Sequence, residues 1–222
     1  MIIGNGIIAN AVKSYDTNDV VFFASGVSNS LETRPSEFER ELSLLKTVMK
    51  EHQEKKLIYF STLSIHDQSK QDSPYVLHKK TIEEYIKNNT ENFLILRIGN
   101  IVGKGGNPNT LFNFLTSRIN ENNTFTLHLK ARRLLLDIED ISKFLGSHRM
   151  NPENKTINLA FPYYYDLKEI VKGIEKRTGK KAYFSETDEG DFYRVDFDED
   201  IEKFFSGIHP QDYLETLTQK YI

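Results

Sequence analysis

The feature that most constrains the fold is a regular alternation of two kinds of segment along the chain. Short apolar runs, rich in β-branched and aromatic residues, are separated by longer segments whose apolar residues recur at helical spacing. Most of these runs are continuously apolar, which is typical of strands buried on both faces of a parallel sheet. Right-handed connections between such strands place helices on both faces. The pattern therefore predicts an α/β fold with a doubly wound parallel sheet.

The expected elements divide the chain into two parts. The strands expected in the sheet are Met1–Ile3, Val20–Ala24, Leu57–Phe60, Phe93–Leu96 and Thr156–Leu159. The helices expected between them are Ile7–Ser14, Ser36–His52, Pro74–Asn88 and Thr110–Ile119. After about residue 150 the texture changes to a helix, an acidic aromatic stretch and a last helix, which in a doubly wound protein form a substrate-side subdomain. We expect residues 1–150 to form the main domain and residues 151–222 a small C-terminal subdomain.

Composition excludes several classes of protein. The net charge is −3 and no Lys/Arg block stands out, so neither nucleic acid nor an anionic membrane is the expected partner. The chain has no cysteine, which excludes disulfides, thiolate catalysis and Cys-ligated metals. The six His residues are scattered, and we expect no metal site. No transmembrane segment or signal peptide is evident, so the expected location is the cytoplasm.

A glycine turn joins the first expected strand to the first expected helix. Its spacing is G-x-G-x-x-A, in the segment Gly4-Asn5-Gly6-Ile7-Ile8-Ala9. Glycines there let the backbone approach a pyrophosphate at a helix N-terminus, as in a Rossmann-like dinucleotide site. A plain tight turn is the alternative. The acidic residue expected about 20 residues later, which would bind the adenosine ribose, has no convincing candidate.

A second feature is a Tyr–Lys pair one helical turn apart, at Tyr75 and Lys79. Pro74 fits the first turn of a helix and Ser73 its N-cap, so both side chains share one helix face. An ammonium beside a phenol stabilises the phenolate, and such a Tyr can exchange a proton with a carbinol or carbonyl oxygen. The alternative is an ordinary solvated helix face. His78 points elsewhere on the helix, where we expect it to pack at the surface.

The preceding strand ends in two hydroxyl residues, Ser61 and Thr62, where ligands bind in open α/β sheets. With Ser73–Lys79, this segment resembles the extended short-chain dehydrogenase/reductase family, which includes nucleotide-sugar epimerases, dehydratases and reductases. The resemblance implies a Rossmann-like fold and a catalytic set of Thr62, Tyr75 and Lys79, with Ser61 as the next match by register for the catalytic hydroxyl. By the same resemblance, NAD or NADP would contact Gly4, Asn5, Gly6, Ile7, Ala24, Ser25, Gly26, Ser61, Tyr75 and Lys79.

Two later segments extend the resemblance. Residues 96–103 resemble the family's L-R-x-x-N-V-Y-G, and residues 133–140 resemble its R-D-F-I-x-V-x-D. The resemblance implies that Asn100 contacts the sugar-nucleotide near its diphosphate and that Arg133 clamps a phosphate, with Asp140 capping or anchoring the next helix. A loop that contains Lys104 follows Asn100 and could assist with phosphate.

The chain also departs from the family. Its glycine turn is not the family's G-x-x-G-x-x-G, and the segment 38–42 offers no match for the Asn often found on the central helix. Too few residues separate the first expected helix from the strand at Val20 to hold the family's second and third strands. We therefore expect a sheet that is narrowed on the adenine side.

The resemblance implies an NAD(P)-dependent oxidoreductase or epimerase acting on a nucleotide-linked sugar. A 4-ketoreductase or epimerase fits better than a dehydratase, because no Asp-Glu pair follows Thr62. Synthesis of surface polysaccharide precursors and a homodimer are further expectations from the resemblance. The alternative is a binding module of the same fold that has lost efficient catalysis, and the short adenosine side favours it.

Overall fold

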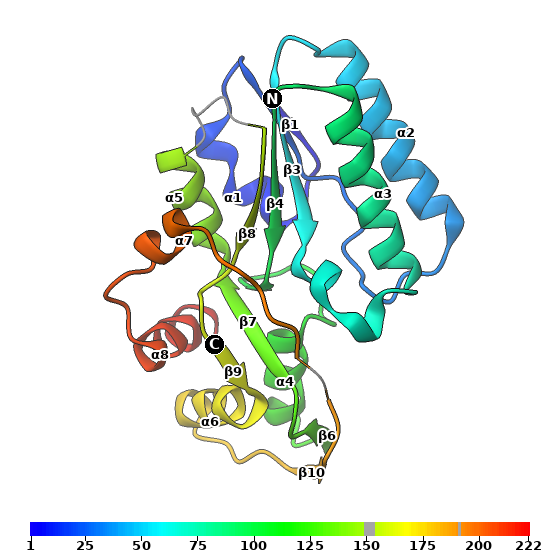
Figure 1. Ribbon diagram of the computed structural model, residues 1–222. Helices are drawn as coiled ribbons and strands as arrows, with labels where there is room; N and C mark the ends of the chain where they lie inside the picture. Colours follow the sequence, from blue (N-terminus) through cyan, green and yellow to red (C-terminus); the bar gives the residue numbers. More distant parts are fainter. Residues whose placement is uncertain (149–153, 191) are drawn as a thin grey trace.

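The sheet at the centre of the molecule is built from the predicted strands. The computed structural model describes residues 1–148, 154–190 and 192–222, and in these ranges five parallel strands pair in the order β1-β2-β3-β4-β8 (Figure 1). Their bounds are β1 (Ile2–Ile3), β2 (Val20–Phe23), β3 (Lys56–Thr62), β4 (Phe93–Ile98) and β8 (Lys155–Leu159). The predicted parallel sheet is confirmed, and β3 and β4 run two residues beyond their expected ends.

Helices cover both faces of this sheet, as the doubly wound fold requires. One face carries α2 (Pro35–Glu51) and α3 (Pro74–Asn89), and the other carries α1 (Ile7–Ala11) and α5 (Ile138–His148) (Figure 1). Successive strand residues point to opposite faces. Phe23 packs in the cluster that contains the helical residues of α2 and α3, whereas its neighbour Phe22 packs in the cluster on the other face.

The sheet is narrow at the β1 edge. After α1 the chain makes one 3₁₀ turn at Lys13–Tyr15 and enters β2 at Val20, so the described chain contains no strand between them. The strand order places β1 at the edge, where a wider doubly wound sheet would continue. The predicted narrowing on the adenine side therefore corresponds to a direct α1-to-β2 connection.

The C-terminal part of the fold adds two small sheets and further helices. One sheet joins β5 (Asn100–Val102), β7 (Arg132–Asp137) and β9 (Tyr164–Asp166), and the other joins β6 (Phe125–His128) and β10 (Phe184–Thr187). The helices are α4 (Leu111–Asn120), α6 (Leu167–Thr178), α7 (Glu199–Phe204) and α8 (Pro210–Tyr221). The predicted boundary at residues 150 and 151 lies outside the described residues, while β8, which follows it, pairs with β4 in the main sheet.

Local signals account for the starts of four helices, α2, α3, α6 and α8. Pro35, Pro74 and Pro210 occupy the first turns of α2, α3 and α8, where the missing N–H costs nothing. A capping box between Asp166 and Glu169 opens α6. Ser73 is the N-cap of α3 as predicted, but its side chain makes no capping hydrogen bond to the described residues.

A polar contact fixes α8 to the start of α5. The Tyr213 hydroxyl donates to Asp140 Oδ2 over 2.7 Å and accepts from the Asp137 amide over 2.8 Å. Asp140 therefore anchors α5 to α8. The residue that caps the start of α5 is Asp137, whose Oδ1 accepts from the Glu139 amide. The Lys220 ammonium contacts Asp137 over 2.7 Å near the end of α8.

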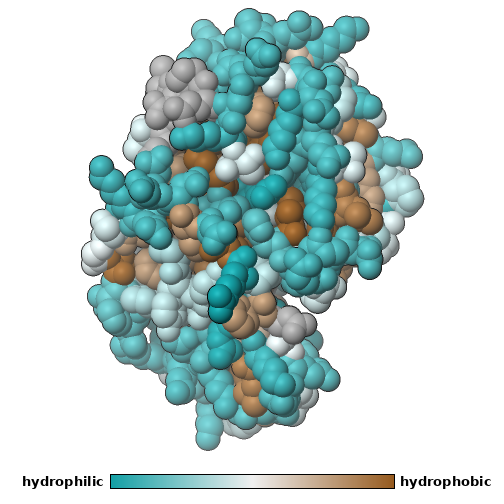
Figure 2. Space-filling view, viewed as in Figure 1, coloured by the Kyte–Doolittle hydropathy of each residue, from teal (hydrophilic) through white to brown (hydrophobic). Residues whose placement is uncertain are grey.

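Hydrophilic residues dominate the face drawn in Figure 2, and hydrophobic residues form separate small patches on it. Within the described ranges, no helix combines the length and apolar character needed to cross a bilayer.

Candidate active site

The loop that follows β2 contacts both the glycine turn and the Tyr–Lys pair. The Ala24 amide donates to the Ile3 carbonyl over 2.8 Å, and a Cβ atom at Gly4 would lie 2.4 Å from the Ala24 carbonyl oxygen. At the other end of the loop, a Cβ atom at Gly26 would lie 2.8 Å from Lys79 Nζ. The fold therefore brings Gly4, residues 24–26 and Lys79 into one continuous site, although they are far apart in the sequence.

The two glycines of the turn should differ in how much stability is lost when each is replaced by Ala. Gly4 has a φ of +129° and is packed on Ala24, so Gly4→Ala should destabilise the fold by at least about 1–3 kcal/mol and disturb the turn. A Cβ atom added at Gly6 would have no described atom within 4 Å, so Gly6→Ala should leave the melting temperature nearly unchanged. Thermal unfolding of both variants checks this, and equal melting temperatures would contradict it.

Tyr75 lies in the first turn of α3 with its side chain largely buried. It packs in a small apolar cluster with Val27 and Val76, against which Phe38 and Ile65 also lie. Lys79 Nζ is 5.8 Å from the centre of the Tyr75 ring, which confirms that the two side chains share a face of α3. Val27 extends the contact of the β2 loop from Lys79 to Tyr75.

The Lys79 ammonium is held in a buried polar network. It donates to Glu41 Oε1 and to the Tyr59 hydroxyl, each over 2.9 Å. The Tyr59 hydroxyl also donates to Glu41 Oε1 over 2.7 Å, and His78 Nε2 donates to Glu41 Oε2 over 3.0 Å. The expectation that His78 packs at the surface is wrong, because its ring is buried against Glu41 and stacks near Phe38.

Glu41 was not predicted as a site residue. Burial alone would raise the pKa of Glu41, but the Lys79 ammonium and the hydrogen bonds from His78, Val27 and Tyr59 hold that pKa well below its usual range. Burial and the adjacent Glu41 raise the pKa of Tyr59 well above 10. The sequence signal that could have identified Glu41 was its helical spacing. Glu41 shares the buried face of α2 with Leu45 and Val48.

The two hydroxyl residues at the end of β3 point to different partners. Thr62 Oγ1 accepts from the Ser64 amide over 3.1 Å and so fixes the turn that follows the strand. Ser61 Oγ donates to Glu83 Oε1 over 2.6 Å, and Glu83 also receives the Arg97 guanidinium, with Arg97 Nη2 2.6 Å from Oε2. Ser61 is thus engaged with α3 and β4, while Thr62 faces the opposite side of the sheet.

The residues predicted to bind substrate lie on the adjoining small sheet. Asn100 is paired with Leu135 in the β5–β7 ladder, and its Nδ2 donates to the Leu134 carbonyl over 3.2 Å. Arg133 lies on the same strand, β7, and its Nη1 donates to the Arg132 carbonyl over 2.8 Å. Asn100 and Arg133 are therefore brought close through β7.

Two further residues surround Arg133 that sequence reasoning missed. Burial lowers the pKa of Arg133, and the nearby Tyr193 and Asp67 oppose that shift. Burial raises the pKa of Tyr193 to about 12, and the neighbouring Ser64 side chain opposes that shift. Tyr193 lies in the irregular segment after β10, so no periodic pattern indicated it. It connects the turn after Thr62 to the surroundings of Arg133.

The remaining predicted residues lie around the glycine turn. The loop that carries the exposed Lys104 reaches it, because a Cβ atom at Gly106 would lie 3.1 Å from Ile7 Cδ1. Ser25 accepts from Arg40 of α2 over 3.3 Å. Asn5 and Gly6 are exposed at the start of α1.

Comparison with known proteins places the fold. Neither a protein-family model nor a curated protein matches the sequence. Among solved structures, the UDP-N-acetylglucosamine 4-epimerase from Methanobrevibacter ruminantium M1, in complex with UDP-N-acetylmuramic acid, matches with a TM-score of 0.74 at 17% identity, over 100% of this chain and 81% of that chain. The chain has the extended short-chain dehydrogenase/reductase fold.

Two further structures with this fold match almost the whole chain. dTDP-glucose 4,6-dehydratase from Bacillus anthracis str. Ames, in complex with NAD, matches with a TM-score of 0.69 at 15% identity, over 99% of this chain and 78% of that chain. The UDP-glucose 4-epimerase of Thermus thermophilus, in complex with NAD, gives 0.66 at 13% identity, over 96% and 80%. The predicted resemblance is confirmed at the level of fold.

The residues present fit one half of a dinucleotide better than the other. The open turn at Gly6, the loop 24–26 and the Tyr75–Lys79 pair are contiguous, and by the resemblance they would hold the pyrophosphate and the nicotinamide of a dinucleotide. On the adenosine side, the described chain ends its sheet at β1. A dinucleotide would therefore depend on contacts to its nicotinamide half.

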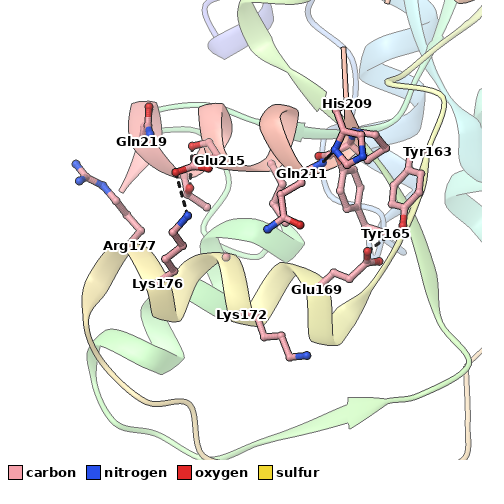
Figure 3. Close-up of a pocket in the computed structure, with 14 residues that line it drawn as sticks. Tyr163, Tyr165, Glu169, Lys172, Lys176, Arg177, His209, Gln211, Glu215 and Gln219 are labelled. Carbon is pink, nitrogen blue, oxygen red and sulfur yellow. Dashed lines mark hydrogen bonds and ion pairs between the residues drawn. The ribbon is translucent and has the colours of Figure 1, made fainter. Parts of the chain in front are cut away.

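A groove of about 590 Å³ lies away from this site, between α6 and α8 (Figure 3). Four of its side chains bind one another in pairs: Lys176 Nζ is 3.1 Å from Glu215 Oε1, and the Tyr163 hydroxyl donates to Glu169 Oε1 over 2.9 Å. None of the described residues predicted for catalysis lines it. The groove is a space between two packed helices, and we assign it no role.

Proposed function

We propose that this chain is an NAD(P)-dependent oxidoreductase or epimerase that acts on a nucleotide-linked sugar, with a 4-ketoreductase or epimerase as the best-fitting activity. Tyr75 is its acid/base, Lys79 the cation beside it, and Thr62 the hydroxyl that binds the reacting oxygen. Asn100 and Arg133 bind the substrate's diphosphate, with Lys104 nearby. The surface polysaccharide pathway expected from the resemblance belongs to this proposal as its biological setting.

The observation that carries the proposal is the β2 loop. Its backbone packs on Gly4 at one end, and Gly26 and Val27 lie against Lys79 and Tyr75 at the other. A ligand lying along this loop would thus meet the glycine turn and the Tyr–Lys pair in turn. This is the arrangement that hydride transfer beside a proton donor requires.

The proposed chemistry assigns the proton to Tyr75. A free Tyr has a pKa near 10, so it needs a nearby positive charge to act as a base at neutral pH. Lys79 supplies that charge 5.8 Å from the ring centre. Thr62 would donate a hydrogen bond to the same sugar oxygen and orient it. A nicotinamide dinucleotide, when bound, supplies or accepts the hydride.

Binding of reduced dinucleotide tests the proposal directly. Purified protein titrated with NADH and with NADPH should enhance or shift nicotinamide fluorescence, and the signal should saturate below millimolar concentration. Bovine serum albumin at the same concentration controls for nonspecific enhancement. Absence of saturable binding of both cofactors at millimolar concentration would refute the enzyme assignment.

A second candidate function is a nucleotide-sugar binding module without efficient catalysis. Two observations favour it: the sheet ends at β1 on the adenosine side, and the Lys79 ammonium is engaged with Glu41 and Tyr59. Calorimetry with UDP- and dTDP-sugars distinguishes the two. Sugar-nucleotide binding without dinucleotide binding would support the module, whereas binding of both supports the enzyme.

A further inference from the structure

Glu41 is a carboxylate buried completely beneath the proposed cofactor site. Its relative exposure is 0%, and each of its two oxygens accepts two hydrogen bonds. Oε2 accepts from the Val27 amide over 2.7 Å and from His78, and Oε1 accepts from Tyr59 and Lys79. The carboxylate thus joins the loop after β2, strand β3 and helix α3 to its own helix, α2.

Such a carboxylate must have a specific reason to be ionised inside the protein. Removing a charge from water costs several kcal/mol unless a counterion and hydrogen bonds replace the solvent. Lys79 is the counterion, and its side chain is itself only 3% exposed. The loop closes over the pair, because a Cβ atom at Gly26 would lie 2.8 Å from Lys79 Nζ and 3.0 Å from Glu41 Oε1.

We propose that Glu41 is a positioning residue for the Tyr75–Lys79 pair: its carboxylate holds the Lys79 ammonium in place and, through the Val27 amide, holds the cofactor-facing loop above it. The inference rests on the proposed function for its effect on cofactor binding. The Glu41 carboxylate is the direct partner of two elements that the site needs, and at 0% exposure it offers no surface to a cofactor or substrate.

Glu83 provides a matched comparison on the same side of the sheet. It is also a buried carboxylate, with 2% exposure, and it also accepts from a hydroxyl and a cation, Ser61 and Arg97. Its partners lie on β3, on β4 and on α3 itself, where Lys87 Nζ is 3.6 Å from Oε2, and do not include the loop 24–27. If both carboxylates are merely structural, replacing either one should affect Lys79 and the loop 24–27 to a similar extent. If Glu41 is a positioning residue, replacing Glu41 should affect them more than replacing Glu83.

The test compares Glu41→Gln, Glu41→Asp and Glu83→Gln. Two measurements report on the site without any cofactor. Amine labelling of the intact protein, read by mass spectrometry, reports how accessible the residue 79 amine is, and hydrogen exchange of a peptide spanning residues 24–30 reports how firmly the loop is held. We expect Glu41→Gln to increase the labelling rate and the loop exchange rate by about tenfold each, and to weaken NADH or NADPH binding by about tenfold. Without its carboxylate partner, the Lys79 ammonium is no longer held in a single conformation. Glu41→Asp should be intermediate.

Glu83→Gln should lower the melting temperature while leaving residue 79 labelling and loop exchange within about twofold of the wild type. Equal effects of Glu41→Gln and Glu83→Gln on labelling and exchange would overturn the inference. If Glu41→Gln fails to fold, unchanged labelling and exchange in Glu41→Asp would overturn it. If the wild type binds no dinucleotide, the proposed function fails, while the cofactor-free readouts still decide the role of Glu41.

Discussion

Replacing Tyr75 by Phe should reduce turnover by about a hundredfold to ten-thousandfold, because it removes the group proposed to transfer the proton. Folding and dinucleotide affinity should change little. The ring packs on Val27 and Val76, and Phe preserves that apolar contact. Steady-state kinetics with a nucleotide sugar that the wild type converts, together with NADH or NADPH titration and a melting curve, measure the three properties separately.

Tyr85→Phe is the matched control for this experiment. Tyr85 lies on the same helix and has a cation over its ring, since Lys46 Nζ is 5.2 Å from the ring centre. It packs against the cluster on the α2 and α3 side of the sheet, away from the loop 24–27. Tyr85→Phe should therefore keep wild-type activity. Wild-type turnover by Tyr75→Phe would exclude Tyr75 as the acid/base.

The parts of the fold that the sequence predicts well are those set by local spacing. The strands β2, β3 and β4 contain short continuous apolar runs, and burial on both faces leaves that pattern little ambiguity. The helix α3 begins at Pro74 because the residue type and its φ angle favour a first turn. These signals need no knowledge of the rest of the chain.

The small sheets were not predicted because most of their strands lack such a pattern; β7, with Leu134–Leu136, is the exception. β5 and β9 have three residues each, and β10 has exposed or half-buried side chains throughout. Their existence depends on partners far along the chain, since β6 pairs with β10 across about sixty residues, from Phe125 to Phe184. Tertiary pairing, rather than local propensity, stabilises these strands.

The site shows the same division. The spacing of Tyr75 and Lys79 predicts that they share a helix face, and they do. The partner of the Lys79 ammonium could not be read from spacing, because Glu41 is 38 residues away and lies on another helix. A Glu at a core-facing position of α2 was the available hint. A charge on an apolar face requires a counterion from elsewhere in the fold.

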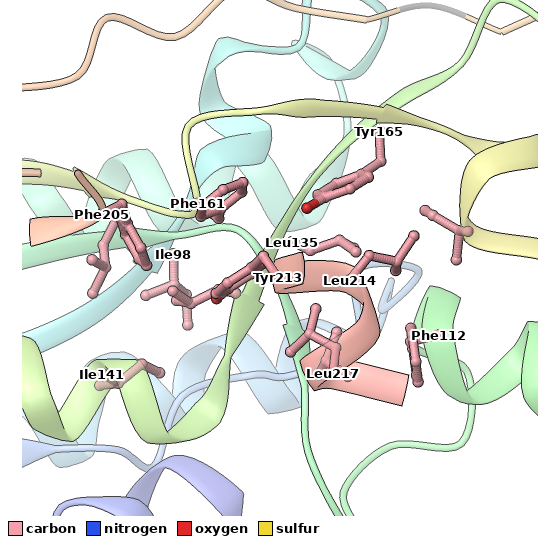
Figure 4. Packing of buried hydrophobic residues seen from close by; sticks show 14 of the residues in the cluster. Ile98, Phe112, Leu135, Ile141, Phe161, Tyr165, Phe205, Tyr213, Leu214 and Leu217 are labelled. Atoms are coloured by element: carbon pink, nitrogen blue, oxygen red, sulfur yellow. The ribbon is translucent and has the colours of Figure 1, made fainter. Parts of the chain in front are cut away.

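Replacing Phe161 by Ala should produce the largest loss of stability in the C-terminal part. Phe161 follows β8 and is almost fully buried at the centre of the aromatic cluster in Figure 4. Its ring stacks on Tyr213 with centres 4.1 Å apart and a 9° angle between planes, and meets Phe205 edge-on at 5.4 Å. Removing a buried Phe side chain costs about 3–5 kcal/mol. The melting temperature should fall by roughly 6–20 °C.

Phe192→Ala is the control, because the Phe192 side chain is 50% exposed and its removal should cost less than about 1 kcal/mol.

The position of Phe161 also predicts which binding activity the Phe161→Ala variant retains. Phe161 lies against β7, the strand that carries Arg133, because its amide donates to the Leu135 carbonyl over 2.9 Å, whereas the loop 24–27 lies against α2 and α3. Well below its melting temperature, the Phe161→Ala variant should therefore retain dinucleotide affinity within about threefold while losing affinity for nucleotide sugar. Equal loss of both affinities in a folded variant would show that the two halves of the site are coupled through the aromatic cluster.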